Sequence, residues 1–247
     1  MNRLVRAELA KLRTTRTTPV LLATMAAFAA LLTAAILTLA GHQGNPPLDA
    51  NALRTFVGAP SRLLSGVVLL VGILAMAGEL RHTTITPTFL VAPDRARVVV
   101  AKLAAVALAG LFFAVVAEAV ALAVAVPALA AKGVAVHVTG AVGRELAGVL
   151  VVAALSGMLG VAVAALVGNQ LAAVVGAVLW VFVAESVLPV LFHDPGLSRW
   201  LPGAAAAALT EPGGQHLSMW AGGLVLAAYG LALAAVGTRL VVRRDVT

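Results

Sequence analysis

Two carboxylates inside apolar stretches are the residues whose type and position could do chemistry. Glu118 lies in the apolar run 98–126, and Glu185 lies in the run 171–192. A charge at the centre of a membrane costs about 2.5–3.5 kcal/mol on insertion scales, so such side chains usually face a helix bundle or a water-filled path. Each glutamate could therefore line a substrate path or carry a proton. Each could equally form a hydrogen bond between packed helices, with its carboxyl protonated.

The signatures of common enzymes are missing from the sequence. There is no cysteine, which excludes a disulfide framework, a thiolate zinc site and a thiol nucleophile. Lys11, Lys102 and Lys132 each follow an alanine, whereas the lysine of a phosphate-binding P-loop follows a glycine. The histidines lack the spacing of a metalloprotease helix, and no serine lies in a Gly-x-Ser-x-Gly turn. We therefore expect no catalytic residues, no metal and no cofactor in this chain.

The composition points to a membrane protein. The chain has 247 residues, of which 62% are hydrophobic and 11% are charged, and its mean hydropathy is +1.05. Soluble domains have about 45–50% apolar and about 25% charged residues. This chain could not cover its surface with polar groups in water, so we expect a multi-span membrane protein.

Six runs are long enough to cross a bilayer, which takes roughly 20 apolar residues as a helix. We expect an all-α integral membrane fold with an N-terminal segment at 1–18 and one transmembrane domain at 19–247. Pro127 should end the third span, and Gly168-Asn169-Gln170 should form a tight turn between the fourth and fifth spans. The predicted spans are 19–39, 57–78, 98–126, 146–167, 171–192 and 219–242.

The basic residues predict the orientation of the spans. Twelve of the seventeen lysines and arginines fall on the side that carries both termini. The positive-inside rule then predicts that both termini lie in the cytoplasm. We expect the chain in the inner, or cytoplasmic, cell membrane. This asymmetry also explains the net charge of +7 without a nucleic-acid partner.

Residues 1–18 have the pattern of a basic amphipathic helix. At 100° per residue the apolar residues fall on one arc and the arginines on the other, although Glu8 interrupts the apolar arc. Such a helix could lie along the inner surface, attracted by anionic lipids. It could also be a simple positive-inside anchor. The apolar arc contains Met1, Leu4, Val5, Leu9 and Leu12, and the basic arc contains Arg3, Arg6 and Arg13.

The connection between the second and third spans is long and is not simply hydrophilic. It contains the apolar or β-branched pieces Thr84-Ile85 and Phe89-Leu90-Val91, and Pro87 and Pro93 divide it. Such a connection fits a short helix that docks on a partner protein.

The order of these features resembles the permease subunits of ABC-2 type exporters. The layout covers the whole chain: a basic amphipathic start followed by six spans. The more specific pattern is Glu79-x-Arg81-x-x-Thr84, then Pro93-x-Arg95, then Ala101-Lys102.

The resemblance implies roles for several segments. The connection between spans 2 and 3 would form a cytoplasmic coupling helix that contacts a separate ATPase subunit, which would use the ATP. A second permease copy, identical or related, would complete the path across the lipid bilayer, and residues 193–218 would carry short re-entrant helices. The implied coupling residues are Glu79, Arg81, Thr84, Pro93, Arg95 and Lys102.

The resemblance thus implies the membrane-spanning subunit of an ATP-driven exporter of unspecified substrate. An ion-coupled secondary transporter is the alternative, with Glu118 and Glu185 as its proton sites. A membrane protein without transport activity is a further alternative. Small residues such as Ser156, Gly160 and Ala164 recur along one face of the fourth span, which predicts close packing within the chain or between subunits.

Overall fold

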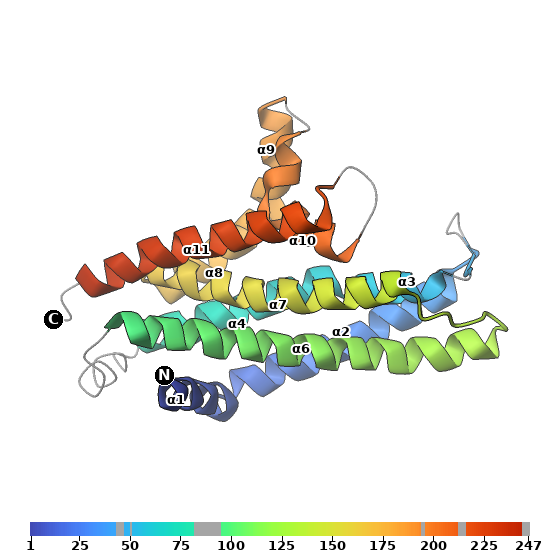
Figure 1. The fold of residues 1–247 in the computed structure, drawn as a ribbon, viewed down its shortest axis with the longest axis horizontal. Coiled ribbons are helices and arrows are strands. Elements are labelled where there is room, and N and C mark those ends of the chain that lie inside the picture. The colour runs from blue at the N-terminus through green and yellow to red at the C-terminus, as the bar shows by residue number, and fades with distance from the viewer. Residues whose placement is uncertain (43–46, 50, 82–94, 194–195, 212–215, 244–247) are drawn as a thin grey trace.

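The protein is helical, and no strand occurs in the part of the chain that the structure describes. The computed structural model describes all residues except 43–46, 50, 82–94, 194–195, 212–215 and 244–247. Figure 1 shows the long helices side by side in one elongated bundle. The elements are α1 (Asn2–Thr14), α2 (Thr17–Leu39), α3 (Ala52–Gly58), α4 (Ser61–Arg81), α6 (Arg95–Ala131), α7 (Gly140–Val167), α8 (Gln170–Leu179), the π-helix η1 (Trp180–Ala184), α9 (Glu185–Leu191), the 3₁₀-helix η2 (Leu197–Trp200), α10 (Pro202–Thr210) and α11 (Met219–Arg243).

The prediction of six membrane-spanning helices is confirmed in length and composition. Within the described residues, six helical segments are long and apolar enough to cross a bilayer. Their bounds are Thr17–Leu39, Ala52–Arg81, Ala96–Ala131, Gly140–Val167, Gln170–Leu191 and Met219–Arg239. The second span includes the short helix α3, so it begins earlier than predicted.

The predicted end of the third span at Pro127 is wrong. The helix α6 continues through Pro127 to Ala131. A proline lacks the N–H that would bond to the preceding turn, but only about one turn follows it here. Leu129 in that turn is buried together with Ala125 and Phe56, so packing holds the end of the helix in place.

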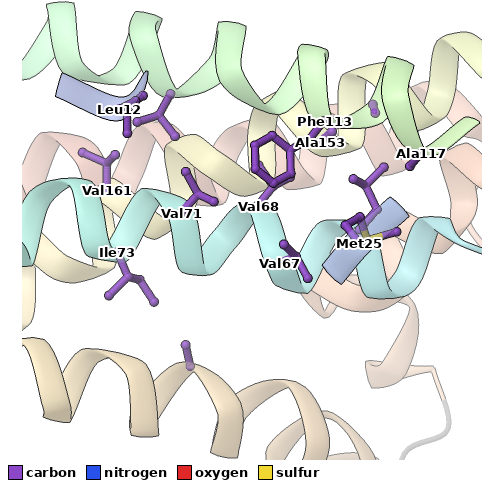
Figure 2. Packing of buried hydrophobic residues seen from close by; sticks show 14 of the residues in the cluster. Leu12, Met25, Val67, Val68, Val71, Ile73, Phe113, Ala117, Ala153 and Val161 are labelled. Atoms are coloured by element: carbon purple, nitrogen blue, oxygen red, sulfur yellow. The ribbon is translucent and has the colours of Figure 1, made fainter. Parts of the chain in front are cut away.

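The helix α7 is the centre of the bundle, in contact with α4, α6, α10 and α11. Glycines allow its closest approach to α4, because a Cβ at Gly160 would overlap the backbone carbonyl of Leu69 and one at Gly72 would overlap that of Gly157. Figure 2 shows the side chains between these helices, including Val68 of α4 and Phe113 of α6. The face of the fourth span that carries the small residues therefore packs within this chain.

The predicted turn between the fourth and fifth spans is also confirmed. Gly168 has a φ of 72°, a left-handed conformation that a glycine adopts without strain, and it ends α7. The side chain of Asn169 then accepts a hydrogen bond from the backbone N–H of Ala172 and caps α8.

The fifth span differs from the other spans in its geometry and packing. It continues from α8 through the π-helix η1 into α9. Only 11% of the residues in its most apolar 18-residue stretch are buried. Figure 1 shows α9 projecting away from the layer formed by α6, α7 and α11. The chain returns through η2 and α10, and α10 packs on α7 and α11 through Ala205 and Leu209.

Candidate functional site

The N-terminal helix α1 is bound to the bundle by a buried acidic residue. Its apolar arc faces the protein, where α1 packs on α6, and Glu8 and Leu12 are its two buried side chains. In the sequence pattern, Glu8 interrupts the apolar arc. The structure corrects that interpretation, because the Glu8 carboxylate accepts a hydrogen bond from Lys102 of α6.

Four side chains from three helices form one ion cluster. Lys102 pairs with Glu8 and, at 2.9 Å, with Glu79 at the C-terminal end of α4. Lys11 of α1 lies 2.5 Å from Glu8 and 2.8 Å from Glu79. Each ammonium therefore bridges the same two carboxylates. We call Glu8, Lys11, Glu79 and Lys102 the ion cluster.

The charges in the ion cluster balance, which makes their burial tolerable. The Lys102 side chain is 3% exposed and that of Glu8 is 7% exposed. Burial alone would raise the pKa of Glu8, but the neighbouring ammonium groups of Lys102 and Lys11 outweigh it and hold this pKa below its usual value. Burial likewise opposes the charge on Lys11, but hydrogen bonds to Glu79 and Glu8 raise its pKa overall.

The ion cluster contains two of the six residues that the resemblance assigns to coupling. Glu79 lies in the last turn of α4 and Lys102 lies in the second turn of α6, so both are close to residues 82–94 in the sequence. Arg81 is exposed and is outside the cluster. Its Nη1 lies 3.5 Å from the side-chain oxygen of Gln170 at the start of α8.

The side chains of the other three predicted coupling residues lie outside the described part of the chain. Thr84 and Pro93 lie outside the described residues. Arg95 begins α6, but its side chain is also outside the described part of the chain. The geometry of the coupling prediction therefore rests on Glu79, Arg81 and Lys102.

Glu118 lies in the middle of α6 and faces the interior. It is 5% exposed, and neither of its carboxylate oxygens has a hydrogen-bond partner among the described residues. The buried residues Ala114, Ala117 and Ala121 share its side of the helix. An unpartnered acid at this depth is expensive and calls for a structural or functional reason.

Glu185 has protein partners. Its Oε1 accepts hydrogen bonds from the backbone N–H of Gly203, at 2.9 Å, and from Nε1 of Trp180, at 3.2 Å. Gly203 lies in the first turn of α10, so the carboxylate occupies the N-terminus of a helix, where negative charge is favourable. The observed geometry of Glu185 fits a role in holding α10 to the fifth span.

A second ion pair lies at the opposite end of the bundle. Arg54 of α3 donates from Nε to Glu145 of α7 at 2.7 Å, and its Nη2 is 2.5 Å from the same oxygen. Sequence reasoning missed this pair and the role of Glu8. Glu145 follows a predicted loop and its partner is 91 positions away, so no local pattern indicates that the two side chains meet.

Comparison with known proteins adds no family assignment. No protein-family model matches the chain, and no curated protein matches it.

Proposed function

We propose that this chain is the membrane-spanning permease subunit of an ATP-driven exporter of the ABC-2 type. A separate ATPase subunit would bind at the segment between α4 and α6. A second copy of the permease, identical or related, would complete the path. The observation that carries the proposal is the ion cluster, because it joins α1 to both helices that flank this segment.

The ion cluster suits the transmission of movement. Each of its lysines bridges carboxylates on two helices, so α1, the end of α4 and the start of α6 are linked as one unit. ATP-driven closure of the ATPase subunits would push on this unit and bias the bundle between inward-facing and outward-facing states. Such a bias requires that the ATPase bind the two states with different affinity.

Other features take a role in the same proposal. The exposed arginines of α1, Arg3, Arg6 and Arg13, would face the ATPase or anionic headgroups while its apolar arc packs on α6. The short helix α10 would be the re-entrant segment before the last span. Backbone at membrane depth is tolerated where it is buried in protein, and α10 buries Ala205, Ala208 and Leu209.

The test is purification of the tagged chain in mild detergent, followed by an ATPase assay on what is recovered. The proposal expects a P-loop ATPase subunit in stoichiometric amount. Arg81→Ala should reduce ATP hydrolysis by the recovered complex without loss of insertion, because Arg81 is exposed at the end of α4. Arg144→Ala, in the exposed first turns of α7 at the opposite end, is a position control for the ATPase contact and should leave recovery of the ATPase unchanged. Recovery of the permease without an ATPase would refute the proposal.

An ion-coupled secondary transporter is the second candidate, and Glu118 is the observation that favours it. Both of its buried oxygens lack partners in the described part of the chain, so a proton or cation could occupy the site. Transport by proteoliposomes under an imposed pH gradient, without ATP, would support this candidate if Glu118→Gln abolished it. Gradient-independent transport that requires ATP would exclude it.

A further inference from the structure

An open apolar cleft lies between α2, α4 and the fifth span. It has a volume of about 340 Å³, within the range of ligand pockets. Its walls are almost entirely hydrocarbon. Phe28 and Leu32 come from α2, Gly66 and Leu69 from α4, and Val178 and Phe182 from α8 and η1.

The cleft opens at the surface that a bilayer would cover. Phe28 is 37% exposed, Val178 is 42% exposed and Phe182 is 70% exposed, and all three lie in candidate membrane spans. The π-helix η1 supplies Val181 and Phe182 to one wall, and π-helical segments inside helices occur frequently at functional sites.

One charged side chain lines this apolar cleft. Arg62 lies in the first turn of α4, and its side chain is exposed. Its guanidinium makes no hydrogen bond or ion pair within the described residues. It acts electrostatically on Glu185, whose Oε1 is already engaged by Gly203 and Trp180. The guanidinium donors of Arg62 therefore have no hydrogen-bond acceptor among the described residues, although they lie beside a hydrocarbon-lined cleft.

We propose that this cleft binds an anionic phospholipid, with one acyl chain between α2, α4 and the fifth span and the headgroup phosphate on Arg62. A guanidinium can donate two parallel hydrogen bonds to a phosphate. The apolar walls match an acyl chain, and Arg62, the one cation that lines the cleft among the described residues, matches one negative headgroup. This inference rests on the chain spanning a membrane and does not depend on the proposed exporter function.

The cleft offers a filling variant and a matched control. A Cβ at Gly66 would meet no atom within 4 Å, so Gly66→Leu places a side chain into the open cleft without displacing the backbone. Gly78, on the same helix and outside the cleft, also has no atom within 4 Å of a Cβ. Gly78→Leu therefore adds the same bulk elsewhere on α4.

The experiment is native mass spectrometry of the full chain, titrated in detergent with phosphatidylglycerol or phosphatidylcholine. We expect the first phosphatidylglycerol molecule to bind more tightly than the first phosphatidylcholine molecule. Arg62→Gln should weaken that binding by about tenfold, the effect of losing one charge-assisted hydrogen bond, and should affect phosphatidylcholine less. Gly66→Leu should weaken both lipids, and Gly78→Leu should match the unmodified protein.

Any one of four results would overturn the inference. The two lipids could bind equally to the unmodified chain, the preference for phosphatidylglycerol could survive Arg62→Gln, or Gly66→Leu could bind as well as Gly78→Leu. A second copy that covers the cleft would appear as a dimer without bound lipid, and that result would also refute the proposal.

Discussion

At the scale of single residues, Lys102 is a buried cation between carboxylates of two other helices. Its side chain is 3% exposed and pairs with Glu8 and Glu79. We expect Lys102→Met to destabilise the fold by about 3–5 kcal/mol, because it leaves two buried carboxylates with one ammonium between them. Thermal unfolding in detergent, followed by tryptophan fluorescence, measures this loss.

Lys132→Met provides the matched control for that change. Lys132 is exposed and donates to the backbone oxygen of Leu37 at 2.6 Å, so the same substitution removes a lysine without stranding a buried acid. We expect a clearly smaller loss. Equal losses for the two variants would mean that the ion cluster contributes no more than an ordinary surface contact.

The pKa of Glu8 makes the attachment of α1 dependent on pH. Its folded-state pKa lies below the ordinary value of 4.5, so its stabilising contribution is present above pH 4.5 and is lost as the pH falls through the lower folded value. We expect the stability difference between the unmodified chain and Glu8→Gln to be constant near neutral pH and to shrink in acid. Comparing their melting temperatures from pH 7 downward tests this. A difference that stays constant into strong acid would show that the charge of Glu8 does not hold α1.

At the scale of helices, glycines set the distance between α4 and α7. A Cβ at Gly72 would overlap the backbone oxygen of Gly157, whereas one at Gly66 would meet nothing within 4 Å. We expect Gly72→Ala to destabilise by about 1–3 kcal/mol through forced separation of the helices. Gly66→Ala should stabilise by about 0.5–1 kcal/mol, since alanine is the better helix former.

The measurement is the melting temperature of the two variants purified in the same detergent. We expect Gly72→Ala to lower the melting temperature and Gly66→Ala to raise it. A shift of the same sign and size at both positions would contradict the close approach of α4 and α7.

The sequence alone predicts the helices well because each span is a long apolar run. The length of a run fixes how far a helix can extend, and the turn at Gly168 and Asn169 is encoded locally. The predicted helix end at Pro127 is wrong because the packing of Leu129 outweighs the hydrogen bond that proline removes from the helix. Local patterns describe an element well until tertiary contacts decide where it ends.

The candidate site is harder to predict for the same reason. Glu8 and Lys102 are 94 positions apart, and their contact depends on how α1 crosses α6. The sequence shows that Glu8 lies on the apolar face of its helix, but it does not show which base meets it. Glu79 and Lys102 entered the prediction through a family pattern, and their mutual contact came only with the fold.

At the scale of the whole molecule, the helices and the charges together predict the orientation in the membrane. Figure 1 shows α1 and the end of α11 at the same end of the bundle, opposite the link between α6 and α7. Twelve of seventeen basic residues belong to segments on the side of the termini. The positive-inside rule therefore predicts that the α1 end faces the cytoplasm.

The absence of cysteine from the chain allows a direct test of this orientation. Thr14, at the end of α1, and His137, between α6 and α7, are both exposed and outside the candidate spans. In intact cells, a membrane-impermeant maleimide should label His137→Cys and should label Thr14→Cys only after the membrane is opened. The reverse pattern would place the ion cluster on the outer side, where a cytoplasmic ATPase could not reach it, and would refute the exporter proposal together with the orientation.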